Sequence, residues 1–262
     1  MPPQTDYFDL TGKKAMVVGA EFPAGAAIAR AYAAAGADVA LCALTADAAV
    51  MRARAGKRDS EAMGRHVAEY VMDVTLGKNV QVTTRQVAKE MGGLDIVASA
   101  PELFMAKPIE KTSDTELARV MQVNFASQFF VVRTAAEEFR RDHRAGRILL
   151  VTSVLGGRSM LDTAAYASAH GAVHNLVRAT AHELGSEGIT VNAISLGWMD
   201  WMDDRIDQSS EDGKRALRFP MLRRAGRADE VGGTAVWLAA EHASSFITGQ
   251  IIPVEGGLLQ HQ

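Results

Sequence analysis

The sequence predicts an α/β fold: a single domain in which a doubly wound, seven-stranded parallel sheet is flanked by helices. Two observations indicate this fold class. Short apolar runs, many of them β-branched, alternate with longer alanine-rich segments of helical period, which is typical of repeated βαβ units. The chain has 262 residues and shows no repeat, low-complexity tract or linker, a size that suits one sheet. We therefore expect one domain over residues 1–262.

Seven runs along the chain have the character of strands. Most are short, rich in valine, isoleucine, leucine or alanine, and bounded by glycine or polar residues, as expected for strands that are buried on both faces. In chain order they are Lys14–Val18, Asp38–Leu44, His66–Met72, Leu94–Ala98, Arg147–Thr152, Ile189–Ile194 and Gln250–Val254.

Helices are expected between these strands. Proline suits the first turn of a helix, glycine suits the position after its last residue, and serine or aspartate suits its N-cap. The expected helices are Pro23–Ala35, a basic segment through Arg52, Arg54 and Lys57, Leu76–Met91, a long helix from Ser113 or Asp114 to Arg141, and Thr163–Gly185. Residues 200–220 have no clean period, so we expect a mobile substrate lid over about 196–222.

Composition and charge exclude several classes of protein. A hydrophobic content of 48%, a charged content of 23% and a net charge of −3 describe a soluble domain with no footprint for nucleic acid or anionic membrane. The one cysteine, Cys42, permits no internal disulfide and favours a reducing compartment. Neither a signal peptide nor an apolar run long enough for a membrane is present. We expect a cytoplasmic protein.

A glycine turn joins the first strand to the first helix through Gly19, Pro23 and Gly25. In dinucleotide-binding folds this turn presents backbone N–H groups and a helix N-terminus to a pyrophosphate. Pro23 removes one of those donors but is well tolerated in the first turn of a helix. A phosphate could therefore bind here with fewer donors.

Three further residues stand at informative positions. Ser153 follows the fifth strand, Tyr166 comes thirteen residues later, and Asn124 lies in the long central helix. Together with the glycine turn and the segments Arg223–Val231 and Phe246–Gly257, these residues resemble the short-chain dehydrogenase/reductase superfamily from about Leu10 to Gly257. The resemblance implies a Rossmann-like sheet and an NAD(P)(H)-dependent oxidoreductase that acts on a secondary alcohol or ketone.

The resemblance also implies catalytic roles. Tyr166 would be the general acid or base, Ser153 would donate a hydrogen bond to the substrate oxygen, and Asn124 would hold a water. The family has a lysine four residues after the tyrosine, where this chain has His170. Lysine is a cation that lowers the tyrosine pKa, whereas histidine is largely neutral above its reference pKa near 6.5. We expect slower chemistry or a changed pH profile.

The cofactor site implied by the resemblance is partly altered. At the end of the second strand the acid typical of NAD binding is absent, which gives a weak preference for NADP. The family sequence N-N-A-G appears as Ala98–Pro101, and the family P-G as Leu196-Gly197. Asp73 matches the adenine contact. The expected cofactor-binding residues are Gly19, Ala20, Phe22, Gly25, Leu44, Asp73, Val74, Ser99, Tyr166, His170 and Gly197.

Two alternatives stay open. One is a redox-neutral enzyme on the same fold, such as a halohydrin dehalogenase-like lyase, a dehydratase or an isomerase, without nicotinamide. The other is a non-catalytic subunit. His170 and His174 have a zinc-like spacing but no third ligand, so no metal is expected. The family resemblance implies a homotetramer or homodimer. A hydrophobic substrate is expected because an apolar pocket could be lined by Met160, Leu161, Trp198, Met199, Trp201 and Met202.

Overall fold

A seven-stranded sheet forms the centre of the protein. The computed structural model describes residues 6–43, 61, 64–202, 205, 210–211, 214 and 218–260. All strand pairs are parallel, in the order β3-β2-β1-β4-β5-β6-β7. The strands are β1 Lys14–Val18, β2 Asp38–Ala43, β3 Val67–Val71, β4 Ile96–Ser99, β5 Arg147–Ser153, β6 Thr190–Leu196 and β7 Ile251–Val254. The predicted fold class and single domain are confirmed.

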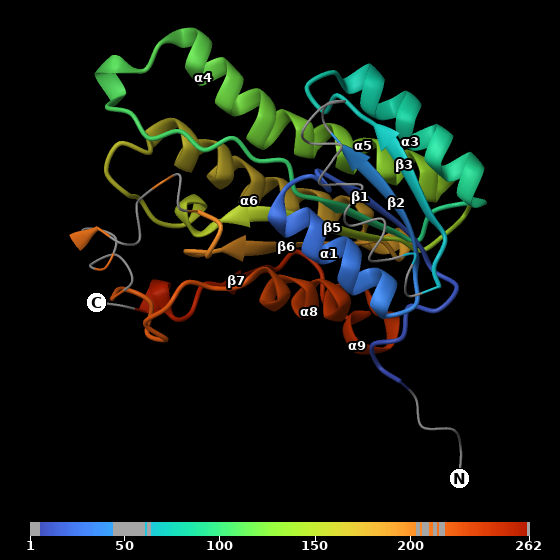
Figure 1. Cartoon of the computed structure of the whole chain (residues 1–262). Helices are drawn as coiled ribbons and strands as arrows, with labels where there is room; N and C mark the ends of the chain where they lie inside the picture. The colour runs from blue at the N-terminus through green and yellow to red at the C-terminus, as the bar shows by residue number, and fades with distance from the viewer. Residues whose placement is uncertain are drawn as a thin grey trace.

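Helices cover both faces of the sheet (Figure 1). On one face lie α1 Pro23–Ala34, α8 Ala228–Ala239 and α9 Glu241–Ser244. On the other lie α3 Gly77–Met91, α4 Asp114–Met121, α5 Ser127–Arg141 and α6 Ala164–Leu184. Each face packs its own apolar core, which supports the doubly wound arrangement. No helix within the described ranges is both long and apolar enough to cross a membrane.

The strand order reverses direction beside β1. The chain runs outward from β1 through β2 to β3, then returns to place β4 on the other side of β1. In sheets of this kind the crevice for a ligand opens at the carboxyl ends of the strands beside this reversal. The glycine turn after β1 and the serine at the end of β5 therefore lie at the functional edge of the sheet.

The segment expected as one helix from Ser113 to Arg141 is in fact interrupted. Ser113 does cap α4, since its hydroxyl accepts the N–H of Glu116 at 3.3 Å while the Glu116 carboxylate accepts the N–H of Ser113 at 2.9 Å. A π turn, Gln122–Ala126, then separates α4 from α5. Such turns bulge a helix and often lie at functional sites, and this one carries Asn124.

Two other sequence predictions need comment. Helix α8 was not among the predicted helices; it contains the adjacent glycines Gly232 and Gly233, which have low helix propensity. In the structure Gly232 lies directly against α1, where a Cβ would be 2.8 Å from the Cβ of Ala31. The basic segment through Arg52, Arg54 and Lys57, together with Leu44 and much of the expected lid, lies outside the described residues.

Candidate active site

The fold brings Ser153 and Tyr166 together. Ser153 ends β5, and a short 3₁₀ helix, Val154–Gly156, turns the chain toward α6, whose first turn carries Tyr166. The Ser153 hydroxyl accepts the N–H of Leu155 at 3.2 Å, which fixes its direction. A hydrogen bond with Ser153 also acts to lower the pKa of Tyr166. Both side chains are buried at the carboxyl edge of the sheet.

A carboxylate absent from the sequence prediction contacts the Tyr166 phenol. Tyr166 Oη donates to Glu102 Oε1 at 2.5 Å, and Glu102 Oε2 lies 2.7 Å from Arg205 Nη2. The Arg205 guanidinium lies 4.7 Å from the centroid of the Phe104 ring, whose edge contacts Tyr166. Burial and the Glu102 charge hold the Tyr166 pKa well above its usual value, while Arg205 opposes them. Glu102 and Arg205 have no spacing signal in the sequence, because each is an isolated charged residue outside the family motifs.

His170 lies one helical turn after Tyr166 and does not provide a cation. Its ring is packed against the Tyr166 ring with centroids 4.3 Å apart, and its Nδ1 lies 2.9 Å from Thr152 Oγ1. The side chain is 3% exposed, so burial lowers its pKa to about 3, with smaller contributions from His174 and Arg205. A neutral imidazole cannot reproduce the charge of the lysine that the family places here.

His174 continues along the same face of α6. Burial lowers its pKa, and a hydrogen bond to the backbone of Ser153 opposes that shift. Its ring also lies where a Cβ on Gly156 would stand, which keeps the β5–α6 connection close. Within the described residues, no group of three or more histidine, cysteine, aspartate or glutamate side chains could hold a metal ion.

Asn124 uses its side-chain amide to hold a neighbouring loop. Its Oδ1 accepts the N–H of Leu103 and its Nδ2 donates to the Leu103 carbonyl, both at 2.9 Å. Both ends of the amide are therefore engaged with the backbone next to Glu102. The side-chain amide of Asn124 therefore fixes the chain next to Glu102. A water at Asn124 would have to be contacted by atoms other than this amide.

The glycine turn is tightly packed. A Cβ on Gly25 would lie 2.1 Å from the carbonyl oxygen of Gly19, and one on Gly19 would lie 2.8 Å from the backbone of Ala100. The N–H groups of Gly19 and Ala20 donate to Cys42, and that of Phe22 to Gly19. A phosphate at this turn would therefore be met by the first amides of α1, those of residues 24 and 25, since a helix leaves these N–H groups without intrahelical partners.

The remaining predicted cofactor residues have mixed surroundings. Asp73 Oδ1 accepts the N–H and the hydroxyl of Thr75 at 2.9 and 2.6 Å, Val74 packs in the core, and Gly197 packs against Glu255. Ser99 Oγ and His170 Nε2 are buried and have no hydrogen-bond partner in the described part of the chain. Buried polar atoms normally have partners. These two therefore suit the ribose hydroxyls of a nucleotide, and the site fits a dinucleotide.

The expected apolar pocket is not formed by the six residues assigned to it. Met199 and Met202 are buried in the core beneath α8, and Trp201 packs against the same cluster. Met160 and Leu161 instead lie on the surface, where they line an open cavity of about 420 Å³. The prediction of one shared pocket is wrong, because the methionines of the 198–202 segment anchor it to the core.

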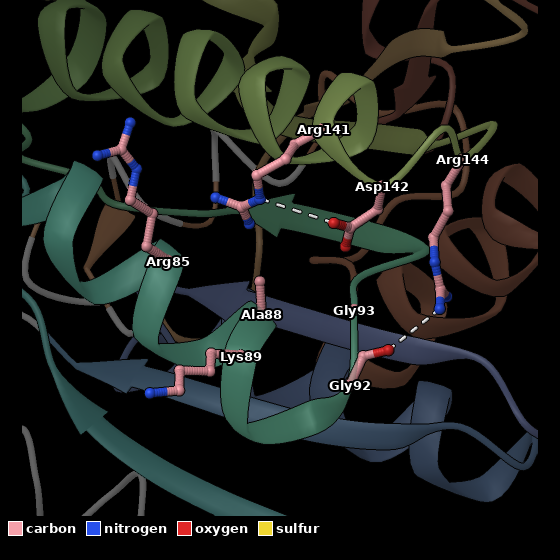
Figure 2. A pocket seen from close by; sticks show the side chains of 8 residues that line it. All are labelled: Arg85, Ala88, Lys89, Gly92, Gly93, Arg141, Asp142 and Arg144. Carbon is pink, nitrogen blue, oxygen red and sulfur yellow. Dashed lines mark hydrogen bonds and ion pairs between the residues drawn. The ribbon is translucent and has the colours of Figure 1, made fainter.

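A larger cavity, of about 670 Å³, lies between α3 and the end of α5 (Figure 2). Two of its basic side chains already have partners: Arg144 donates to Gly92 and pairs with Asp95 at 3.0 Å, and Arg141 lies near Asp142. The cavity adjoins the amino ends of β4 and β5, at the edge of the sheet opposite Ser153 and Tyr166. It is therefore not part of the candidate active site.

Comparison with known proteins agrees with this geometry. Residues 21–259 match the family described as enoyl-(acyl carrier protein) reductase. The 2-dehydro-3-deoxy-D-gluconate 5-dehydrogenase of Pseudoalteromonas atlantica is 30% identical over 96% of this chain and 98% of its own. The structure of an NAD⁺-bound xylitol dehydrogenase superposes with a TM-score of 0.87, at 26% identity, over 97% of this chain and 100% of the other. A protein of Agrobacterium tumefaciens solved with bound NADP gives 0.87 and 26%, over 98% and 100%.

These similarities extend over nearly the whole chain. The matched family covers far more than half of the sequence. One of the solved structures was determined with bound NADP and another with bound NAD⁺. The chain belongs to the short-chain dehydrogenase/reductase superfamily of oxidoreductases.

Proposed function

We propose that the protein interconverts a secondary alcohol and a ketone with a nicotinamide nucleotide, using Tyr166 as general acid and base. The observation that carries this proposal is the buried pair of Ser153 and Tyr166 at the carboxyl edge of the sheet. Tyr166 would give a proton to the carbonyl oxygen, or take one from the alcohol. Ser153 would orient the same oxygen and stabilise its developing charge.

Several residues would hold the nucleotide. The first turn of α1 would meet the pyrophosphate, Asp73 and Val74 would lie at the adenine, and Ser99 and His170 would meet ribose hydroxyls. Gly197 would border the nicotinamide. When bound, the nucleotide supplies the hydride acceptor or donor; the protein residues supply the proton and the orientation.

The choice between NAD and NADP involves a residue of the glycine turn. The absence of an acid after β2 favours NADP, as the sequence predicts. Glu21, however, is buried in the turn close to β2: burial raises the pKa of Cys42, and the Glu21 charge adds to that shift. A carboxylate here would accept ribose hydroxyls and repel a 2′-phosphate, so Glu21 favours NAD. Measuring the affinities for NADH and NADPH, and taking their ratio, would decide between NAD and NADP.

The substrate is proposed as a secondary alcohol or ketone of hydrophobic character. Met160 and Leu161 support this, because they leave apolar surface beside the start of α6. A relative named for a sugar acid makes a polar hydroxy acid the second class to test. Three probe substrates separate these classes: 2-decalone, a bicyclic ketone; D-gluconate, an acid; and xylitol, a neutral polyol.

Tyr166→Phe tests the proposed role of the phenol. We expect kcat for the best of the three probes to fall by about 100-fold or more, the lower range for loss of general acid–base catalysis. Affinity for the nucleotide, measured by calorimetry, should stay within about threefold of the wild type, because the ring and its packing are kept. Full activity in the phenylalanine variant would contradict the proposal.

Two properties of the whole protein accompany this proposal. A homotetramer or homodimer is proposed from the family resemblance, and light scattering should give two or four times 28.1 kDa. The cytoplasm is the proposed compartment, since Cys42 is a buried, free thiol that a reducing environment suits.

A further inference from the structure

The Tyr166 phenol has a proton acceptor within the protein. Its hydroxyl donates to Glu102 Oε1 at 2.5 Å, so a carboxylate oxygen lies directly at the phenol proton. The phenol is fully buried, whereas the Glu102 side chain is 23% exposed. A proton that reaches Glu102 can therefore pass to water, and one on Tyr166 has no such direct path.

His170 does not compete for this role. Its contact with Tyr166 is between ring edges and faces rather than between hydroxyl and ring nitrogen, and its Nδ1 is engaged with Thr152. Burial keeps the imidazole neutral, with a pKa of about 3. His170 stands where the family has a lysine. It therefore provides neither a positive charge nor an acceptor for the phenol proton.

Arg205 supplies the positive charge instead. It pairs with Glu102 Oε2 at 2.7 Å, and its side chain is only 11% exposed. It also lies 4.7 Å from the Phe104 ring, within the range of a cation–π contact. Among the residues that the structure describes, the charged groups that act on the phenol are the Glu102 carboxylate and the Arg205 guanidinium, and the neutral His170 ring packs beside it.

The backbone beside Glu102 is fixed on both sides. Pro101, immediately before Glu102, has its own φ fixed by the ring, and Asn124 holds the N–H and the carbonyl of Leu103 from the π turn. These two neighbours restrict the chain that carries the carboxylate and favour its position at the phenol. The arrangement is that of a positioned proton-transfer partner.

We propose that Glu102 is a catalytic residue that exchanges a proton with Tyr166, and that Arg205 positions it. The proposal rests on the proposed oxidoreductase function. In alcohol oxidation the hydroxyl proton of the substrate passes to Tyr166 Oη as the phenol proton passes to Glu102 Oε1. Two O–H bonds break and two form, and no electrons move within this relay. In ketone reduction each transfer runs in reverse, and Glu102 is reprotonated from water.

The first test needs neither nucleotide nor substrate. The ultraviolet absorbance of tyrosinate is followed from neutral to alkaline pH for the wild type and Glu102→Gln, each against the same background carrying Tyr166→Phe. Subtracting the curve of the Tyr166→Phe protein from that of its parent leaves the absorbance of Tyr166 and removes that of Tyr7, Tyr32 and Tyr70. Removing the carboxylate while Arg205 remains should lower the pH at which Tyr166 ionises by about one unit or more. Identical curves would show that the two groups are not coupled and would overturn the proposal.

The second test separates proton transfer from a structural role. With the best probe substrate, Glu102→Gln should lower kcat by about 100-fold while KM changes little, and Glu102→Asp should recover part of the loss. Added acetate should restore turnover to Glu102→Ala, which a merely structural carboxylate would not allow. Glu183→Gln changes an exposed acid near the C-terminal end of α6; it is the control and should behave as the wild type.

The outcomes distinguish this proposal from the proposed function. Full kcat and an unchanged pH profile in Glu102→Gln would overturn the role of Glu102, even if the wild type turns over substrate. A wild type that binds no nucleotide and turns over no probe would remove the oxidoreductase function, and Glu102 would lose its catalytic role with it. If the first test nevertheless showed coupled ionisation, it would establish only that Tyr166 and Glu102 interact, not that they catalyse a reaction.

Discussion

At the scale of single residues, the phenol of Tyr166 lies among groups that the sequence places far apart. Glu102 follows β4, His170 belongs to α6, and Arg205 stands in the segment after β6. In the family, one lysine lowers the pKa of the weakly acidic tyrosine phenol. Here a carboxylate accepts the phenol's hydrogen bond and an arginine carries the cation, while His170 is neutral.

The buried histidine makes stability depend on pH. Burial lowers the pKa of His170 from 6.5 to about 3. Between these values the unfolded chain binds a proton that the folded chain does not, so the free energy of unfolding falls as pH falls from about 6.5. One such group contributes a slope of up to about 1.4 kcal/mol per pH unit. The contribution of His170 to stability is fully present above its pKa of 6.5 in the unfolded chain. It is lost as the pH falls toward its pKa of about 3 in the folded protein.

Replacing His170 by glutamine should therefore flatten this dependence. Urea unfolding between about pH 6 and pH 5, above the main carboxylate range, should show a shallower loss of stability than in the wild type. His242→Gln is the control, because that histidine is exposed in the folded protein. An equal slope in wild type and His170→Gln would mean that His170 is protonated in the folded state.

At the scale of elements, the packing of α8 on α1 depends on a glycine. Gly232 faces α1, where a Cβ would lie 2.8 Å from the Cβ of Ala31 and 3.2 Å from the carbonyl oxygen of Ala27. Gly233, the next residue of the same helix, has no atom within 4 Å of its Cβ position. Gly232 therefore allows α8 to approach α1 closely, whereas Gly233 only lowers the helix propensity of α8.

This difference predicts opposite effects of the same substitution. Gly233→Ala should raise the free energy of unfolding by about 0.5–1 kcal/mol, the helix propensity gained over glycine. Gly232→Ala should lower it by about 1–3 kcal/mol, because the added methyl forces the helices apart. Urea denaturation measures both. Equal stabilisation in the two variants would show that α1 and α8 do not pack this closely.

The same scale shows what sequence reasoning could reach. Strand β1 was predicted with its observed bounds, and the other strands to within two residues at each end, because buried strands are short apolar runs between clear stop signals. Helix α8 was missed because its glycines serve packing that only the neighbouring helix reveals. The break at Gln122–Ala126 was missed because a π turn leaves the apolar pattern of a helix almost intact.

The site was predicted to the extent that it follows fixed spacings. Ser153 and Tyr166 stand on neighbouring elements, so their separation along the chain could be compared with the family. Glu102 and Arg205 are about one hundred residues apart in the chain and come together only through tertiary packing, which no local pattern encodes. The methionines at 199 and 202 were assigned to a pocket because composition alone cannot tell a lid from a core anchor.

At the scale of the whole molecule, the account depends on a nucleotide site at the carboxyl edge of one cooperative sheet. The glycine turn after β1 keeps its close packing, and buried polar atoms at Ser99 and His170 suit a ligand. A ligand that binds only the folded state stabilises the entire domain, by about 2.7 kcal/mol at 100 times its Kd. Binding at this edge should therefore be visible in global unfolding.

Calorimetric titration of the purified protein with NADH and NADPH, paired with thermal unfolding, is the most direct test. The account predicts saturable binding of at least one nucleotide, with a rise in Tm at saturation and an affinity ratio that reports the influence of Glu21. No binding of either nucleotide at millimolar concentration would contradict it. That result would favour the redox-neutral or non-catalytic alternatives for this fold.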